Sequence, residues 1–146
     1  MREFQGRGIV GGRARAEALV TAHALNLTAA FSKPPNLVRR WNGVIQDRNH
    51  ELYKQDIAGR VLIFPQCIGS TYTGMVLLEV INRGRGPAAM VVANADSLLV
   101  SGALLAEVWL ERKVPLVEVA SAEIFSAIRT GDSVEVDGDQ GRVRVL

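Results

Sequence analysis

The feature that most constrains the fold is an apolar run in the middle of the chain, residues 60–65 (RVLIFP). A strand with almost no polar side chain is buried on both faces, as the inner strands of parallel sheets are. Residues 66–74 (QCIGSTYTG) follow as a loop of small and hydroxyl side chains, and residues 75–82 (MVLLEVIN) have the apolar density of a buried helix. Strand, loop and helix in succession form half of a βαβ unit.

The same pattern recurs toward the C-terminus. Residues 87–92 (PAAMVV) and 114–119 (VPLVEV) predict two further apolar strands, and residues 98–108 (LLVSGALLAEV) predict a helix. A short helix is expected at 120–128, with Ser121 as its N-cap. Right-handed crossovers through such helices make the central strands parallel.

The two ends of the chain are rich in β-signals. Residues 4–22 predict a strand, a Gly11-Gly12 turn and a second strand. Residues 131–146 alternate valine with polar residues around Asp137-Gly138, which is typical of a β-hairpin. Two weaker segments are a loop at 32–36 (SKPPN) and a short strand at 43–46.

These segments together predict an α/β domain with central parallel βαβ units. The flanking β-segments must close or flank the central sheet, which gives a mixed β/β/α sandwich or barrel. The 146 residues show no linker, repeat or low-complexity tract, so we expect one domain over 1–146.

Composition excludes several classes of protein. No apolar run approaches the ~20 residues that span a bilayer, and the first residues lack the apolar stretch of a signal peptide, so we expect no membrane and a cytoplasmic location. Arginines cluster near the start, but the net charge is only +2 and no aromatic residues interleave with them. We therefore expect no nucleic-acid partner.

Cysteine and histidine contents argue against a metal site in this chain. Cys67 is the only cysteine, so neither an intrachain disulfide nor a CxxC site exists. His23 and His50 have no spacing that suggests a metal pair. An iron–sulfur cluster takes three or four thiolates, so such a cofactor must be held by another chain.

The loop after the first central strand is the best candidate for function. In open α/β sheets, ligands bind at the carboxyl ends of strands, beside helix N-termini that favour anionic groups. Gly69 allows close approach of a ligand, and Ser70, Thr71 and Thr73 provide hydroxyls. The competing interpretation is that Ser70 or Thr71 only caps the helix.

The loop lacks the motifs of two common enzyme classes. It has no Gly-x-Ser-x-Gly elbow and no GxxxxGK[ST] sequence, which argues against a serine hydrolase and a nucleotide P-loop. Asn94 and Asp96 follow the second central strand and are further candidates for ligand contact, with ordinary polar loop residues as the competing interpretation. We expect His50 to be a turn or packing residue, and Glu79 and Glu107 to face solvent or a partner.

The central segments resemble the small subunit, or swivelling domain, of the aconitase X family. The resemblance is carried by residues 59–80 (GRVLIFPQCIGSTYTGMVLLEV) and 83–108 (RGRGPAAMVVANADSLLVSGALLAEV). It extends to AEALV at 16–20, GVIQD at 43–47 and His50. No single motif is highly specific, but their order and spacing together are.

The resemblance implies the swivelling β/β/α fold and the dehydration of a small hydroxy acid. It implies a large-subunit partner whose cysteines hold an iron–sulfur cluster or iron, while this chain alone binds no cofactor. Ser70 falls on the active-site serine of the family, which removes the proton next to the substrate carboxylate. The expected substrate-binding residues are Cys67, Ile68, Gly69, Thr71 and Asn94.

One departure from the family pattern bears on the substrate. Family members often carry Gly-Arg-Gly-Ser or Gly-Lys-Gly-Ser where this chain has Cys67-Ile68-Gly69-Ser70. The missing cation favours cis-3-hydroxy-L-proline over 5-phosphomevalonate, the two substrates known in the family. We expect Cys67 to be a buried, inert thiol rather than a reactive one.

Two other functions share features with this sequence. The C-terminal hairpin resembles that of swivelling phosphocarrier domains, but those need a histidine in the loop, and this loop has none. A non-catalytic interaction module that kept the fold is the second, and the Cys67-Ile68 pair is the feature that favours it.

Overall fold

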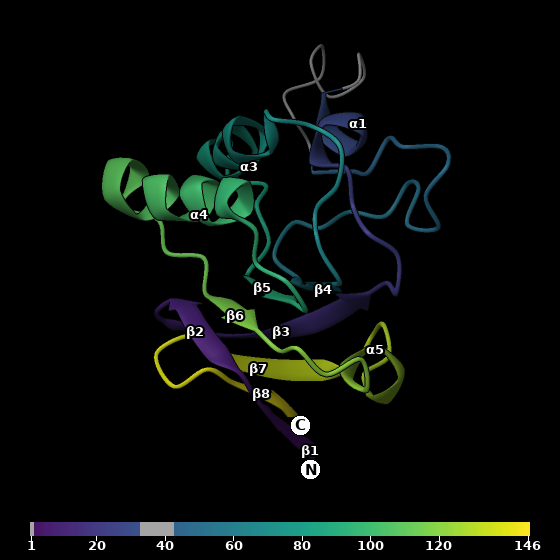
Figure 1. Cartoon of the computed structure of the whole chain (residues 1–146), viewed down its shortest axis with the longest axis vertical. Coiled ribbons are helices and arrows are strands. Elements are labelled where there is room, and N and C mark those ends of the chain that lie inside the picture. Colours follow the sequence, from purple (N-terminus) through teal and green to yellow (C-terminus); the bar gives the residue numbers. More distant parts are fainter. Residues whose placement is uncertain (1, 33–42) are drawn as a thin grey trace.

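Figure 1 shows the computed structural model of the chain, which describes residues 2–32 and 43–146. Two helices, α3 (Thr73–Asn82) and α4 (Ser97–Leu110), lie side by side over one face of a curved sheet. The sheet has eight strands in the order β1-β8-β7-β3-β4-β5-β6-β2. The result is a β/β/α arrangement in which parallel strands separate the helices from an antiparallel layer.

The four central strands are parallel. Parallel pairing was predicted for the three apolar strands 60–65, 87–92 and 114–119, but not for the N-terminal strand beside them. The four strands are β3 (Arg13–Val20), β4 (Val61–Phe64), β5 (Ala89–Val92) and β6 (Leu116–Glu118), and each is paired in parallel with the next. The carboxyl ends of all four therefore meet at one edge of the sheet. The loops that leave this edge include the one that carries Ser70.

The apolar run of the sequence is buried on both faces of β4. Leu62 and Phe64 belong to the core beneath the helices, whereas Val61 and Ile63 belong to a second core on the other face of the strand. The second core is completed by valines of the C-terminal hairpin. The prediction that this strand lies inside the domain is confirmed.

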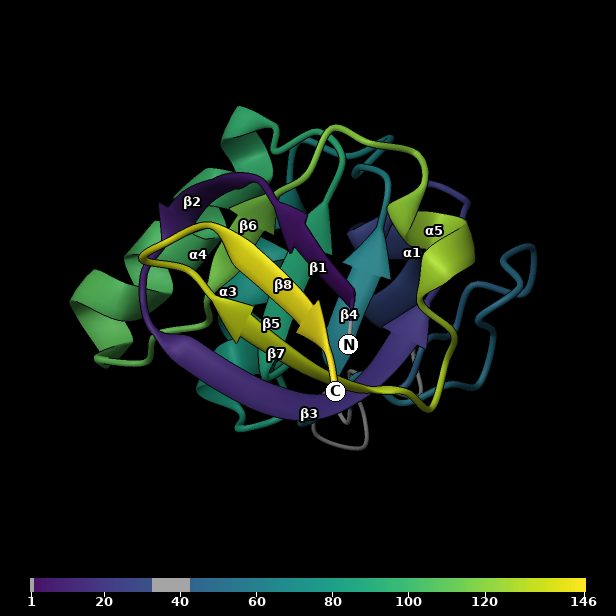
Figure 2. The ribbon, with the colours of Figure 1, turned by 90° about the horizontal axis from the view of Figure 1, so that it is seen from below.

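The N-terminal segment is divided differently from the prediction. It forms β1 (Arg2–Gln5) and β2 (Arg7–Val10), which pair with opposite ends of the strand order and are separated by Gly6. Any Cβ at Gly6 would lie 2.2 Å from the carbonyl oxygen of Glu118. This one-residue link curls the sheet toward a barrel, as Figure 2 shows from below. The break between β1 and β2 at Gly6 was not predicted from the sequence.

The C-terminal hairpin is confirmed, but its turn is longer than predicted. Strands β7 (Ser133–Asp137) and β8 (Arg142–Val145) pair Asp137 with Arg142, so the loop comprises residues 138–141 rather than a two-residue Asp-Gly turn. One carboxylate oxygen of Asp137 accepts hydrogen bonds from the backbone N–H groups of Asp139 and Gln140, both at 3.0 Å. The carboxylate therefore fixes the loop.

Three short segments differ from the sequence analysis. The predicted strand 43–46 is only an isolated bridge between Val44 and Asp56. Helix α5 (Ile124–Ala127) has Glu123 as its N-cap, and Ser121 instead accepts from the Glu123 N–H in the preceding turn. Helix α1 (Leu27–Phe31) was not predicted at all. The predicted loop 32–36 lies, apart from Ser32, outside the described residues.

Helices α3 and α4 cross at a pair of glycines. A Cβ on Gly102 would lie 2.7 Å from the carbonyl oxygen of Gly74, and a Cβ on Gly74 would lie 2.9 Å from that of Leu98. Such distances are shorter than any real side chain tolerates, so the two backbones are in contact. The crossing fixes α4 against the first turn of α3, directly after the Ser70 loop.

The longest helix in the described ranges is α4, and the structure has no helix there that is both long and apolar enough to span a membrane.

Substituting Gly102 with alanine tests the helix crossing. The added methyl group must push α4 away from α3, and overpacking of this kind costs about 1–3 kcal/mol of unfolding free energy. Urea denaturation followed by circular dichroism measures the loss. Ser101→Ala, one residue away on the exposed side of α4, is the control and should change stability by less than about 0.5 kcal/mol. Equal stability of the two variants would contradict close contact at Gly102.

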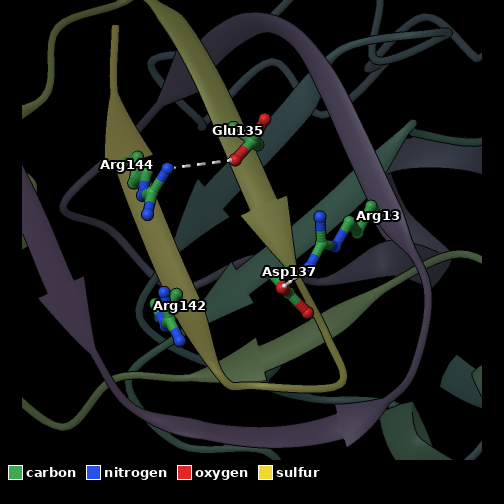
Figure 3. Close-up of a pocket in the computed structure, with 5 residues that line it drawn as sticks. All are labelled: Arg13, Glu135, Asp137, Arg142 and Arg144. Carbon is green, nitrogen blue, oxygen red and sulfur yellow. Dashed lines mark ion pairs between the residues drawn. The ribbon is translucent and has the colours of Figure 1, made fainter.

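Charged side chains form ion pairs on the outer face of the C-terminal hairpin (Figure 3). A guanidinium nitrogen of Arg13 lies 3.1 Å from a carboxylate oxygen of Asp137, and Arg144 reaches Glu135 at 3.8 Å. The backbone N–H of Gln140 and then the nearby arginines lower the pKa of Asp137 below its ordinary value, against the opposing effect of burial. Both carboxylates on this face are thus paired with arginines, and that of Asp137 serves the fold.

Asp137 makes stability depend on pH. Because its folded-state pKa lies below the unfolded value of about 3.9, the carboxylate stabilises the fold above about pH 4, and this contribution is lost as pH falls through the folded-state pKa. We expect Asp137→Asn to lower the melting temperature near pH 7, with the gap to wild type narrowing as the pH falls below about 4. Glu135→Gln, which loses only the longer ion pair, should have a smaller effect. A gap that stays constant with pH would contradict this role.

Candidate functional site

The loop after β4 is anchored to the segment that precedes α1. The N–H of Leu25 donates to the carbonyl of Gln66 at 3.0 Å, and the N–H of Ile68 donates to the carbonyl of Leu25 at 2.9 Å. These bonds make a short parallel bridge between Leu25 and Cys67. The first half of the loop therefore continues the parallel register of β3 and β4 before the chain turns toward α3.

Gly69 is required by the backbone and by a neighbouring side chain. Its φ of +92° lies in the region that favours glycine, and a Cβ would lie 2.5 Å from the side-chain nitrogen of Asn26. Asn26 is itself held in place, because its side-chain oxygen accepts from the Ala29 N–H at 3.1 Å as the N-cap of α1. The loop and α1 thus fix each other.

Ser70 lies in a turn before α3 and does not cap the helix. Its hydroxyl oxygen accepts from the N–H of Tyr72 at 2.9 Å, and its carbonyl accepts from the hydroxyl of Thr73 at 2.9 Å. The N-cap of α3 is Tyr72, which makes no side-chain cap bond, so neither Ser70 nor Thr71 is the cap. The Ser70 hydroxyl consequently sits at the edge of the helix N-terminus with one N–H directed at its oxygen.

A hollow of about 270 Å³, open to solvent, lies in front of this loop. Most of the residues predicted to bind substrate line it, together with the first turn of α4. The exception is Asn94, which is outside the lining and donates through its side chain to Gln66 at 3.3 Å. The lining residues are Cys67, Ile68, Gly69, Ser70, Thr71, Thr73, Asp96, Ser97 and Leu98.

Asp96 connects the hollow to α4. One of its carboxylate oxygens caps that helix by accepting from the N–H groups of Leu98 and Leu99, both at 3.0 Å. The other oxygen is buried and has no hydrogen-bond partner among the described residues. A negative charge is therefore held at the wall of the hollow, close to Cys67.

Cys67 is a neutral thiol. Burial, and then the negative charge of Asp96, raise the pKa of its side chain to about 12. A thiol with this pKa carries almost no thiolate near neutral pH, and the thiolate is the form that attacks electrophiles and binds metals. The structure agrees with the expectation of an inert cysteine.

The histidines and helix acids are placed as expected, away from the hollow. The Nδ1 atom of His50 accepts from the Leu52 N–H at 3.0 Å, so this residue stabilises a turn. His23 lies near Glu51, at 3.8 Å. Glu79 on α3 pairs with Arg83 at the C-cap of that helix, and Glu107 on α4 pairs with Lys113 in the segment after it. In the described part of the chain, no three His, Cys, Asp or Glu side chains form a group that could hold a metal ion.

Comparison with protein families decides what kind of domain this is. A family described as the aconitase X swivel domain matches residues 3–145. The chain belongs to the aconitase X swivel-domain family. Both the family and the α/β architecture predicted from the sequence are thus confirmed.

Relatives of this aconitase X domain match it from end to end. A phosphomevalonate dehydratase small subunit from Archaeoglobus fulgidus is 33% identical over 99% of this chain and 98% of its own length. One from Pyrococcus furiosus is 31% identical over 99% and 96%. The crystal structure of holo aconitase X from Thermococcus kodakaraensis has a TM-score of 0.84 at 29% identity, covering 100% of this chain and 99% of that one.

Asn26, which shapes the loop that carries Ser70, was not predicted from the sequence. Asn26 forms the wall behind Gly69, yet nothing near it resembles a catalytic motif. The available signal was an N-cap asparagine directly before the apolar stretch 27–31 (LTAAF), which predicts a short helix. Its contact with Gly69 depends on the parallel bridge between Leu25 and Cys67, 42 residues apart in sequence, which no local pattern reveals.

The state of Cys67 can be tested by alkylation. Because its pKa is about 12, we expect iodoacetamide to modify the folded chain at about pH 8 at least roughly a hundredfold more slowly than the urea-unfolded chain. Mass spectrometry follows the reaction, and Cys67 is the only thiol that can react. Equal rates in the two states would mean that the thiol is ionised or freely exposed in the folded protein.

Proposed function

We propose that this chain is the small subunit of a two-subunit aconitase X-type dehydratase, and that its substrate is 5-phosphomevalonate. The supporting observation is that the relatives from Archaeoglobus fulgidus and Pyrococcus furiosus, both named phosphomevalonate dehydratase small subunits, align over nearly the whole chain. This favours 5-phosphomevalonate over cis-3-hydroxy-L-proline, which the missing cation in the loop had favoured.

The shape of the site supports a function that needs a second chain. The hollow beside Ser70 is open to solvent, whereas removal of a weakly acidic C–H proton requires a site from which water is excluded. The lining residues include no lysine or arginine to neutralise a substrate carboxylate or phosphate. We expect the large subunit to cover the hollow and to provide those cations.

Ser70 is the proposed base. As an alkoxide, its Oγ would take the proton from the carbon next to the substrate carboxylate, and the electron pair of that C–H bond would form the carbon–carbon double bond as the hydroxyl of the neighbouring carbon departs as hydroxide. Return of the proton from Ser70 to this hydroxide would yield water and restore the alkoxide. The Ser70 hydroxyl is the group placed for this step because it lies in the hollow at the carboxyl edge of β4. Proton removal by a positioned group of this kind typically contributes 10²–10⁴-fold to the rate.

A serine hydroxyl is too weak an acid to be ionised in water, so the fold must stabilise its anionic form. The N–H of Tyr72 already donates to Ser70 Oγ at 2.9 Å, and this bond becomes stronger as negative charge develops on the oxygen. The first turn of α3 adds the positive end of a helix dipole and N–H groups without intrahelical partners. Asp96 acts in the opposite direction, which again requires cations from the partner.

The residues of this chain do not fit an iron–sulfur cluster or an iron ion. Cys67 is a lone neutral thiol, and the described residues contain no group of three potential ligands. We therefore derive no step of the reaction through a metal here. A cluster or iron on the large subunit stays a prediction.

The central test is dehydration by the complex assembled from this chain and its large subunit. We expect turnover of 5-phosphomevalonate and none of cis-3-hydroxy-L-proline, and we expect Ser70→Ala to lower kcat by at least roughly a hundredfold. Ser133→Ala, an exposed serine on β7 far from the hollow, is the matched control and should keep wild-type turnover. Gel filtration of each variant establishes that assembly is unaffected.

The outcomes separate the parts of the proposal. A complex that uses cis-3-hydroxy-L-proline instead would keep the dehydratase and overturn the substrate. Full activity in Ser70→Ala would remove the proposed base, and a chain that binds no large subunit would indicate an interaction module.

A further inference from the structure

Large apolar side chains are exposed around the hollow and along α4. Val108 and Trp109, near the end of α4, are exposed to 70% and 67%, and Met75 on α3 is exposed to 67%. Soluble proteins rarely leave several such residues together in water without a partner. We call the following residues the apolar face: Ile68, Tyr72, Met75, Leu98, Val108 and Trp109.

The apolar face is continuous with the hollow. Ile68 and Leu98 line the hollow itself, as Ser70 does. The glycine crossing brings the backbone of α3 against Leu98, so Met75 lies beside the start of α4. Figure 1 shows the two helices side by side on the outside of the domain. Trp109 follows Leu98 by eleven residues, which places it on the same side of α4, about 16 Å farther along the helix.

The size and composition of the apolar face fit a protein interface. A whole large side chain has a surface of roughly 150–250 Å². Multiplied by the exposed fractions of the six residues, this gives an exposed apolar area on the order of 700 Å². A standard interface buries about 800 Å² on each partner, while the largest apolar patch on a typical monomer is about 300–600 Å². Tryptophan, tyrosine and methionine, the types enriched in interfaces, are all present.

We infer that the apolar face is the docking surface for the large subunit, an inference that rests on the proposed function. A chain that seals the hollow must touch Ile68 and Leu98 in its lining, and the other residues of the apolar face lie on α4, on α3 or at the N-cap of α3. A second copy of this chain fits less well. It would place a second hollow, again without a lysine or arginine in its lining, against the first, and the site would stay incomplete.

The test measures binding of the large subunit to single-residue variants of the full chain. Val108→Glu and Met75→Glu place a charge at two separate points of the apolar face and should each weaken the Kd by roughly tenfold or more, as at interface hot spots. Leu146→Glu makes the same kind of change at an exposed apolar residue at the C-terminus, on the far side of the domain, and should leave the Kd within about twofold. Circular dichroism verifies the fold of each variant.

Hydrogen exchange provides a measurement that needs no variant. Amides of 97–110 should exchange more slowly in the wild-type complex than in the free chain. The inference would be overturned if the wild-type chain bound the large subunit and both Val108→Glu and Met75→Glu bound it equally well. Unchanged exchange in α4 on binding would overturn it too. Either result would leave the proposed function intact. Self-association of the chain that Val108→Glu abolishes, without effect on the large subunit, would assign the face to a second copy. Failure of the wild-type chain to bind any large subunit would overturn the proposed function and this inference together.

Discussion

Both faces of β4 are buried, and the position of every other element follows from this. Leu62 and Phe64 need a layer of helices above the strand, and Val61 and Ile63 need a second layer below it. Parallel neighbours leave one face of the sheet for the crossover helices, so the antiparallel strands from the two ends of the chain must cover the other. The β/β/α order is thus the way in which this strand keeps its apolar side chains from water.

The candidate site uses the edge that this arrangement creates. At the carboxyl end of β4 the chain must pass from the buried layer to the start of α3, and it does so between two tight contacts, Gly69 against Asn26 and Gly74 against α4. Ser70 lies between them, so its position is set by backbone packing on both sides. A half-buried hydroxyl on a loop this constrained is well suited to meet a partner surface without prior rearrangement.

The sequence predicted best those features that depend on local patterns. The apolar strands and the crossover helices are continuous or periodic runs, and the Gly-Ser-Thr loop between them is equally visible. The break at Gly6, the longer turn after Asp137 and the contact of Asn26 with Gly69 depend instead on partners distant in sequence. The exclusion of Asn94 from the hollow has the same origin, because its side chain is engaged by Gln66. Local sequence patterns pointed to the loop that carries the candidate site, whereas tertiary contacts decided which side chains line its hollow.

The link at Gly6 has a mechanical meaning. Strand β1 pairs with β8 and strand β2 pairs with β6, at opposite ends of the strand order. The single segment formed by β1, Gly6 and β2 therefore connects both ends of the sheet. Releasing it would bare two strand edges at once, each with unpaired backbone groups able to capture another chain. The segment that closes the domain therefore also covers two strand edges, and a proteolytic cut at Gly6 would turn β1 into a short separate peptide that is no longer tied to β2.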